Sequence, residues 1–212
     1  MRVLFLDTET TGLPEGKNIS LYNTQKWPYV IQLSYIIFDT EVNEVVHTFD
    51  SVIKLDDNVE ISEKSISMHG VTRERSQTEG VIMKGALEEL NDNLKTIDLI
   101  VGHNISFDKQ IMIVENIRNN VFSLFPKKQS FCTMKEYKMY CDIKKERADG
   151  TTYAKYPTLC ELHEKLFGTK PNNLHNSYVD VLVCARCYMQ KEYNNDIVNT
   201  SNTFKMEWNG GC

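Results

Sequence analysis

Two carboxylates near the N-terminus are the first residues whose types and spacing could do chemistry. Asp7 and Glu9 follow the short apolar run Val3–Leu6 and are separated by one residue. On a β-strand this spacing puts both side chains on one face, where like charges repel. A divalent cation would relieve the repulsion. A polar strand end before the turn at Thr11-Gly12 would read the same way, so the pair alone leaves both interpretations open.

A third carboxylate, Asp108, stands in a comparable position later in the chain. It follows the apolar stretch Leu99–Gly102, which predicts a buried strand, and we expect Ser106 to be the N-cap of the next helix. Asp108 then lies in the first helical turn, where free N–H groups and the helix dipole favour negative charge. An ordinary acidic residue at a helix start would also look like this.

The fourth carboxylate, Asp180, is predicted inside the last helix, and His175 precedes it by five residues. Five helical steps would turn the two side chains about 140° apart, so they could not share one helix face. With Asn176 as the N-cap, however, His175 lies outside the helix and can turn toward the site that Asp180 faces.

The elements that must position these residues predict one mixed α/β domain. The first three strands should form an antiparallel meander, after which strands and helices alternate, and this order favours a mixed sheet flanked by helices. The expected strands cover residues 3–9, 29–39, 45–53, 99–102 and 130–133, and the expected helices cover 62–68, 78–95, a segment from 106, a segment to about 140, 158–167 and a segment from 177. Residues 142–156 read as an exposed loop.

Bulk composition limits the class of protein. The chain has 212 residues, of which 41% are hydrophobic, enough for one domain with a real core. The apolar run before Asp7 is too short for a signal peptide and no stretch resembles a membrane span, so we expect a soluble, intracellular protein. The six cysteines have irregular spacings that predict reduced thiols. Cys184, Cys187, Cys160 and His163 are expected in packing roles.

The charge pattern bears on nucleic acids. A net charge of −5 argues against binding through a global positive field, although it leaves room for a protein that holds phosphates through bound metal. Residues 126–147 carry seven basic and three acidic side chains. Such a run is normally a solvated face, and it is also the best candidate in this chain for contacts with a phosphate backbone.

Taken together, the motifs resemble those of the DEDD 3′→5′ exonucleases, in the DnaQ-like branch with histidine in the third motif that includes the DNA polymerase III epsilon subunit. The resemblance covers roughly residues 1–190, an exonuclease domain, and leaves 191–212 as a tail or extension. The matching segments are Asp7-Thr8-Glu9-Thr10-Thr11-Gly12, Gly102-His103-Asn104-Ile105-Ser106-Phe107-Asp108, His175-x4-Asp180 and Met68-His69-Gly70-Val71-Thr72.

This resemblance implies an RNase H-like fold with a mixed five-stranded sheet. It also implies two divalent cations, Mg²⁺ with Mn²⁺ as a substitute, held by Asp7, Glu9, Asp108 and Asp180. Oxygen ligands of this kind suit Mg²⁺, and two such ions can stabilise both the attacking and the leaving oxygen of a phosphodiester. His175 would act as general base toward the attacking water. The residues implied to contact substrate are Thr10, Thr11, Leu13, His69 and Phe107, the last of which could equally be a core residue.

The expected substrate is a single-stranded or frayed DNA 3′ end, because Asp-Thr-Glu-Thr-Thr-Gly at residues 7–12 resembles the epsilon-type motif more than the Leu-Glu-Met-Thr-Gly form of oligoribonucleases. An enzyme that trims RNA 3′ ends is the alternative, since the same metal site cleaves either sugar. A polymerase-associated proofreader and a stand-alone enzyme both fit. A silent binding subunit does not explain why five mutually repelling or desolvated groups are present.

Overall fold

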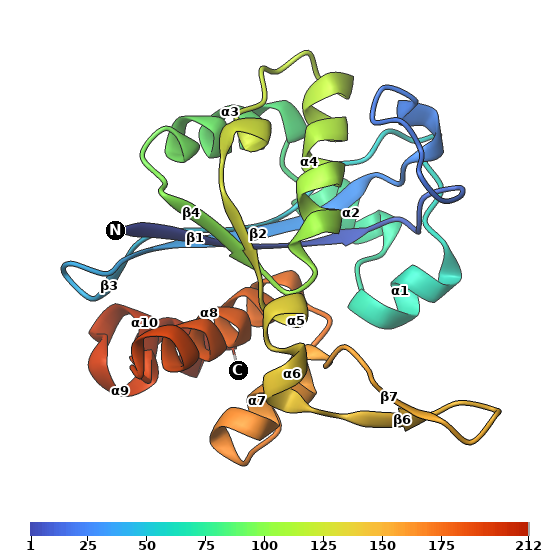
Figure 1. Ribbon diagram of the computed structural model, residues 1–212. Coiled ribbons are helices and arrows are strands. Elements are labelled where there is room, and N and C mark those ends of the chain that lie inside the picture. Colours follow the sequence, from blue (N-terminus) through green and yellow to red (C-terminus); the bar gives the residue numbers. More distant parts are fainter. Residues whose placement is uncertain (212) are drawn as a thin grey trace.

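A mixed five-stranded sheet forms the centre of the computed structural model, which describes residues 1–211 (Figure 1). The strand order is β3-β2-β1-β4-β5; β1 pairs antiparallel with β2 and parallel with β4. The strands are β1 (Arg2–Thr10), β2 (Val30–Asp39), β3 (Glu44–Val52), β4 (Leu99–Gly102) and β5 (Ser130–Cys132). The predicted meander followed by parallel strands, and with it the RNase H-like fold, is confirmed.

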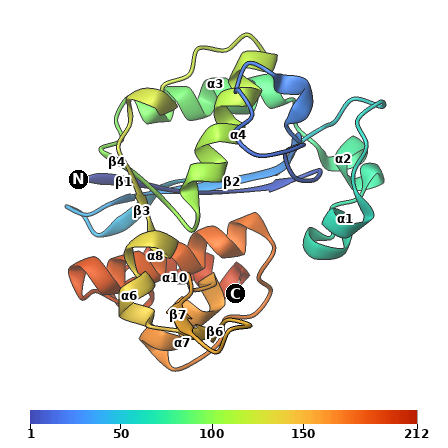
Figure 2. The same ribbon diagram turned by 45° about the vertical axis from the view of Figure 1, so that its right-hand side comes forward.

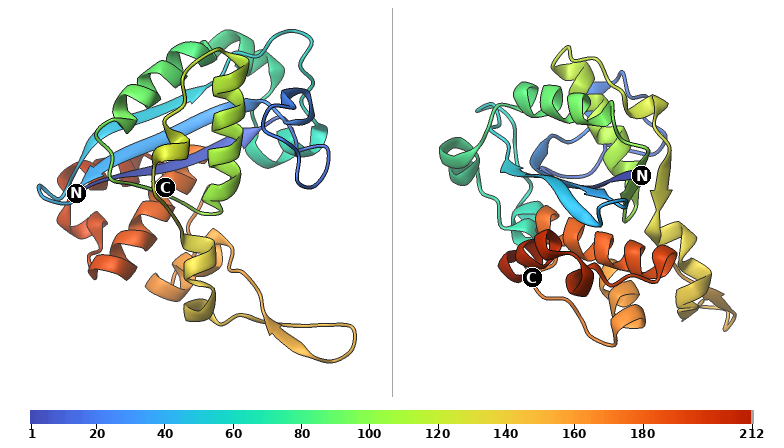
Figure 3. Two further views of the ribbon diagram at one scale, coloured as in Figure 1. Left: turned by 45° about the horizontal axis from the view of Figure 1, so that its top comes forward. Right: turned by 90° about the vertical axis from the view of Figure 1, so that its left-hand side faces the viewer.

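Helices cover both faces of this sheet (Figures 2 and 3). One face carries α3 and α4, and α8 crosses the other face with α7 and α10 beside it. The helices are α1 (Glu63–His69), α2 (Arg73–Glu79), α3 (Met83–Leu94), α4 (Ile105–Arg118), α5 (Thr133–Glu136), α6 (Lys138–Cys141), α7 (Leu159–Phe167), α8 (Ser177–Tyr193), α9 (Ile197–Thr200) and α10 (Asn202–Gly211), with short 3-10 turns at Thr24–Lys26 and Phe125–Lys127.

The alternation of β1 builds two cores. Leu4 and Leu6 join the apolar cluster under α3 and α4, whereas Val3 and Phe5 join the cluster under α8. All four side chains are at most 1% exposed. Because successive strand residues point to opposite faces, this register directs Asp7 and Glu9 toward the α8 face.

The helix expected at 78–95 is wrong in its first part. α2 ends at Glu79, Gly80 and Val81 are not helical, and α3 begins only at Met83. Val81 bonds through its backbone to Val52 and Lys54, which extends the β3 edge. A Cβ at Gly80 would come within 2.6 Å of the Lys54 nitrogen, so the close approach of two backbones ends α2 here.

Other local expectations also need correction. Asn104, not Ser106, is the N-cap of α4, and it takes a left-handed conformation with φ 73°. The helix expected up to about Tyr140 is divided into α5 and α6 at Tyr137. The loop expected at 142–156 contains a two-stranded hairpin, β6 (Lys144–Glu146) and β7 (Thr152–Ala154).

The segment expected as a tail or extension is folded as far as residue 211. α8 continues past residue 190 to Tyr193, and α9 and α10 then turn back against α8 and β3. Arg186 connects these parts: its guanidinium forms two hydrogen bonds with Asp196, 2.9 and 2.8 Å long, and lies over the rings of Phe167 and Trp208. Cys212 lies outside the described residues.

Two expectations from composition can be compared with the described residues. The cysteines at 132, 141, 160, 184 and 187 are free thiols, and Cys184 and Cys187 are buried in the cluster under α8, which is a packing role. No helix within residues 1–211 is long and apolar enough to cross a membrane.

We expect Phe204→Ala to lower the free energy of unfolding by about 3–5 kcal/mol, because it leaves a cavity where α10 packs. Phe204 is fully buried in the cluster under α8. Met206→Ala on the same helix is the control, since Met206 is 69% exposed and should change stability by less than about 0.5 kcal/mol. Urea unfolding of both variants measures this, and equal midpoints would show that α10 does not contribute to the folded core.

Candidate active site

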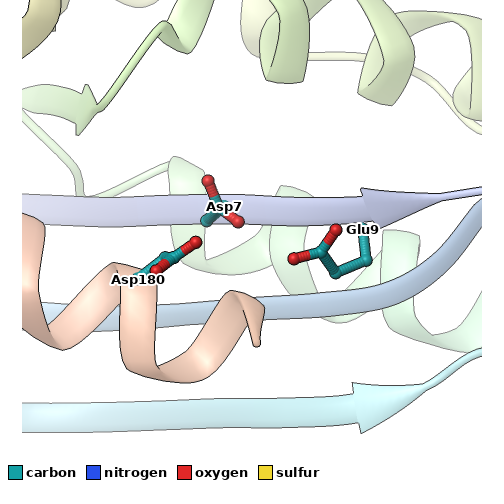
Figure 4. Close-up of side chains that lie close together, drawn as sticks. All are labelled: Asp7, Glu9 and Asp180. Atoms are coloured by element: carbon teal, nitrogen blue, oxygen red, sulfur yellow. The ribbon is translucent and has the colours of Figure 1, made fainter. Parts of the chain in front are cut away.

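Three carboxylates from two elements converge on one side of the sheet (Figure 4). Asp7 and Glu9 project from the second half of β1, and Asp180 projects from the first turn of α8 toward them. One oxygen from each of the three lies within 4.8 Å of the others. The i, i+2 spacing on β1 therefore produces the shared face that the sequence predicts, and α8 completes the group.

Asp108 lies beside this group without belonging to it. Its Oδ1 accepts hydrogen bonds from the backbone N–H of Thr8 at 3.1 Å and from the Thr8 hydroxyl at 2.9 Å. Its side chain is buried in the first turn of α4. The Asp108 charge is still close enough to raise the pKa of Asp7 and of Glu9. The structure thus brings together three of the four predicted carboxylates and holds the fourth next to them.

His175 lies immediately outside α8, as predicted. Asn176 is the N-cap, and its side-chain oxygen accepts from the N–H of Tyr178 at 3.0 Å and of Val179 at 3.4 Å. His175 has φ 73° and an exposed side chain. It is near enough to Asp180 to lower the pKa of that carboxyl, against the larger, raising effect of burial.

A polar strip that sequence reasoning missed attaches α8 to the sheet beside the carboxylates. Ser34 on β2 lies opposite Asp7 in the strand register, and its hydroxyl is 2.5 Å from that of Ser177 at the start of α8. Ser34 also donates to Asp50 at 2.7 Å, and Gln32 donates to the same carboxylate at 2.9 Å. The signal was present in the sequence as two polar residues, spaced i, i+2, inside the apolar run of β2.

The carboxylates sit in an environment that opposes their ionisation. Burial, together with the charges of its neighbours, raises the pKa of Asp7 well above the ordinary range and raises that of Glu9 to about 8. Burial also raises the pKa of Asp108 to about 7 and that of Asp180 to about 6. Within residues 1–211, none of the four forms an ion pair with a lysine or arginine. The only charge shown to oppose these raised pKa values within residues 1–211 is that of His175, which acts on Asp180.

The donor set fits divalent cations. Asp180 Oδ1 is buried and has no hydrogen-bond partner in the described chain, which leaves a strong acceptor without a donor. Oxygen ligands from carboxylates are those that Mg²⁺ and Mn²⁺ prefer. A bound cation would satisfy the unpaired oxygen and reduce the repulsion within the cluster.

The predicted substrate residues differ in exposure and in whether their polar atoms already have hydrogen-bond partners. The Leu13 side chain is 79% exposed, and with Thr11 and Gly12 it lines a hollow whose other side includes Trp27 and Val59. The Thr11 hydroxyl is already occupied, since it accepts from the Tyr29 N–H at 3.0 Å. Leu13 is therefore free to contact a ligand, whereas Thr11 has a structural bond.

Of the remaining three predicted substrate residues, two have structural contacts and one keeps a ring nitrogen without a partner in the described chain. Thr10 donates to the Gly12 carbonyl at 2.8 Å. Phe107 is half-buried and packs against the core cluster under α3 and α4, in line with a core role. His69 at the end of α1 is buried; its Nδ1 accepts from the Val71 N–H at 3.0 Å, and its Nε2 has no partner within residues 1–211.

His103 forms part of the wall next to the site, and sequence reasoning gave it no role. Its Nδ1 is 2.9 Å from the Thr133 hydroxyl, and its Nε2 is 3.1 Å from the carbonyl of Pro157. Burial lowers its pKa to about 4. The neutral ring therefore ties the loop before α4, and so the position of Asp108, to α5 and to the segment that follows β7.

We expect the metal-free protein to lose stability as the pH rises from about 6.5 to 8.5. Over this range the raised pKa of Glu9, about 8, means that the folded state holds more protons than the unfolded state, whose carboxyls are already ionised. The free energy of unfolding must then fall with pH. Buried histidines with lowered pKa values oppose this only below about pH 6.5, where the unfolded imidazoles take up protons.

Thermal unfolding at both pH values, with EDTA and with Mg²⁺, measures this effect. Mg²⁺ should raise the melting temperature more at pH 8.5, because it binds the ionised carboxylates. Glu9→Gln should flatten the pH dependence in EDTA, whereas Glu88→Gln, at an exposed carboxylate on α3, should leave it as in the wild type. A wild-type stability that rises with pH would contradict the carboxylate assignment.

Fold and site together define a class: an RNase H-like α/β protein with a carboxylate-lined centre between the middle strand of its sheet and the last long helix. Residues 4–188 match the sequence model of the RNase T family, described as exonuclease. The chain therefore belongs to this exonuclease family, and the resemblance to the DnaQ-like 3′→5′ exonucleases is confirmed. A search of curated proteins finds no match.

Solved structures with the same fold include several of exonuclease I. The E. coli enzyme in complex with a dT13 oligonucleotide superposes with a TM-score of 0.67 and has 19% sequence identity; the match covers 94% of this chain and 42% of the enzyme. A product-bound exonuclease I has a TM-score of 0.65 and 17% sequence identity, and the match covers 99% of this chain and 45% of that protein. The zinc-bound form of the E. coli enzyme with single-stranded DNA has a TM-score of 0.66 and 17% sequence identity, and the match covers 91% of this chain and 41% of the enzyme. The chain thus spans less than half the length of these proteins.

Proposed function

We propose that this protein is a metal-dependent 3′→5′ exonuclease that hydrolyses the terminal phosphodiester bond of single-stranded or frayed nucleic acid and releases 5′-nucleoside monophosphates. The observation that carries this proposal is the convergence of Asp7, Glu9 and Asp180 within 4.8 Å, with no lysine or arginine of residues 1–211 paired to any of them. Membership of the exonuclease family supports the same reaction.

Each site residue has a part in this proposal. Asp7, Glu9 and Asp180 would hold the cations, with Asp108 supplying a further oxygen from the first turn of α4. Two divalent cations, when bound, supply positive charge for the attacking and leaving oxygens of the phosphodiester. His175, exposed at the rim, accepts a proton from the attacking water. The polar strip from Asp50 through Ser34 to Ser177 fixes α8 and thereby the position of Asp180.

DNA is the substrate we favour, and two observations support this choice. The first motif at residues 7–12 is of the epsilon type, and structural neighbours are described in complex with dT13 and dA16 oligonucleotides. Trimming of RNA 3′ ends is the alternative. We further propose an intracellular location and, for a proofreading role, a DNA polymerase as the partner.

Incubation of the pure protein with DNA and RNA oligomers labelled at either end tests the proposal. With Mg²⁺ we expect mononucleotides to appear from the 3′ end and the 5′-labelled oligomer to shorten in single steps, and EDTA should stop both. Parallel reactions with Mn²⁺ and with Ca²⁺ test which ions substitute. Release from the 5′ end, internal cleavage, or activity that persists in EDTA would each contradict the proposal.

A further inference from the structure

The β6–β7 hairpin adds nothing to the buried core of the molecule. It projects from the body on the same side of the view as α1 and the end of β1 (Figure 1). All three residues of β6 are exposed, and no residue of either strand is among the buried core residues. The hairpin side chains are therefore available to a binding partner.

The base of the hairpin is fixed close to the carboxylates. The Lys155 N–H donates to the Ile143 carbonyl at 2.9 Å, and Ile143 packs against the cluster under α8. Two residues further on, the Pro157 carbonyl is the partner of His103, which lies five residues before Asp108. The base of the hairpin is therefore connected, through Pro157 and His103, to the segment that leads to Asp108.

The two faces of the hairpin carry different charge. In the strand register Lys145 lies opposite Tyr153, and Lys144 lies opposite Ala154. Because directly opposed residues share a face and neighbours along a strand do not, Lys145 and Tyr153 lie on one face and Lys144 and Glu146 on the other. Lys144 forms an ion pair with Asp142 at 2.5 Å. The face with Lys144 is thus neutralised locally.

Arg147 extends the face with Lys145. Its guanidinium lies over the Tyr153 ring, 4.7 Å from the centroid, and its backbone N–H bonds to the Thr151 carbonyl at 2.8 Å, which continues the ladder. Within residues 1–211, neither Lys145 nor Arg147 takes part in an ion pair. The result is an aromatic ring with two uncompensated cations beside it.

From this arrangement we infer that the face formed by Lys145, Arg147 and Tyr153 binds single-stranded polynucleotide that leads to the carboxylate site. A base stacks on the plane offered by Tyr153 and Arg147, and the cations contact the adjoining phosphates. Aromatic rings combined with basic side chains are how single strands are held without reading their sequence. This inference rests on the proposed function, because it concerns the same substrate upstream of its 3′ end.

Two lysines of the basic run at 126–147 lie away from this face. Lys128 donates to the Ile97 carbonyl at 2.7 Å and Lys127 lies over Phe122, both at the far end of β5 from the hairpin. These two lysines are therefore not part of the face formed by Lys145, Arg147 and Tyr153.

Fluorescence anisotropy of a labelled single-stranded oligomer, with Ca²⁺ at fixed concentration and several NaCl concentrations, tests the inference. Lys145→Ala should weaken binding and make the log–log salt slope less steep by about 0.7, the value for one lost phosphate contact on a single strand. Lys144→Ala is the matched control, because it removes the same charge from the opposite face, and it should keep the wild-type slope.

The ring has its own test. Tyr153→Leu, which keeps apolar bulk without a stacking plane, should weaken binding roughly five- to hundredfold, and Tyr153→Phe should restore it. Thermal unfolding shows whether any variant has lost its fold. Oligo-dT and oligo-U of equal length distinguish DNA from RNA as the strand bound, and either one supports the inference.

Equal effects of Lys145→Ala and Lys144→Ala, unchanged binding by Tyr153→Leu, or no binding of either oligomer by the wild type would each overturn the inference. Failure of the proposed function gives a different result. The test uses thymidine 5′-(p-nitrophenyl phosphate), a substrate too small to reach the hairpin, with wild-type protein and Mn²⁺. If the proposed function is wrong, no p-nitrophenol is released, and this result does not depend on the binding data.

Discussion

Asp7→Asn should reduce turnover by roughly a thousandfold or more, because the charge stabilisation that bound cations supply is worth several kcal/mol and each 1.36 kcal/mol changes the rate tenfold. The substitution keeps the size of the side chain and removes its charge from the centre of the cluster. Asp180→Asn should act similarly, since the two residues face the same point from β1 and α8. Single-turnover rates at saturating Mg²⁺ measure the effect.

The same variants should not be less stable than the wild type. Without metal, Asp7 is destabilised by burial and by the charges of Asp108, Asp180 and Glu9, so removing its charge should leave the melting temperature in EDTA unchanged or higher. Mg²⁺ should then raise that temperature less than in the wild type. Glu88→Gln, on an exposed carboxylate of α3, is the control and should keep full activity. If Asp7→Asn kept a tenth of wild-type turnover, Asp7 would not be a metal ligand.

Local sequence was sufficient to predict much of the fold. The meander and the buried strand β4 follow from apolar runs, and the helix ends at Ser62, Gly70, Thr158 and Gly168 follow from capping chemistry that acts within one turn. The shared face of Asp7 and Glu9 follows from strand geometry alone. In each case the deciding interaction lies within a few residues along the chain.

The errors arise where distant backbone decides. Gly80 interrupts the expected helix because the backbone at Lys54 lies against it, and Lys54 is outside residues 78–95. Asn104 replaces Ser106 as N-cap because the chain turns directly from β4 into α4 with a left-handed residue. The fold of residues 194–211 depends on Arg186, Phe167 and Trp208, which are far apart in sequence.

The site shows the same division between local and distant causes. Motif spacing supplied the four carboxylates and His175, but it could not show that Thr8 occupies one oxygen of Asp108, or that Ser34 and Ser177 fix the start of α8. These contacts join residues 100 and 143 positions apart. They are consequences of the strand register and of where α8 crosses the sheet.

His175→Asn should lower turnover by roughly a hundredfold to ten-thousandfold, the range for loss of a general base. Asparagine suits this position because, like histidine, it tolerates the left-handed backbone that His175 adopts at φ 73°. The local turn and the N-cap at Asn176 should therefore persist, and with them the position of Asp180. The loss then reports on the imidazole and not on a displaced helix.

The pH profile separates a base from a structural residue. A general base accepts a proton only in its neutral form, so wild-type turnover should rise with pH, and this limb should disappear in His175→Asn. The stabilisation by Mg²⁺ should stay close to that of the wild type, since the four carboxylates are intact. His47→Asn, at a strand residue on β3 away from the site, should keep both the rate and the limb. A rising limb that survives in His175→Asn would assign the proton transfer to another group, and a lost Mg²⁺ response would make His175 a ligand or a structural residue instead.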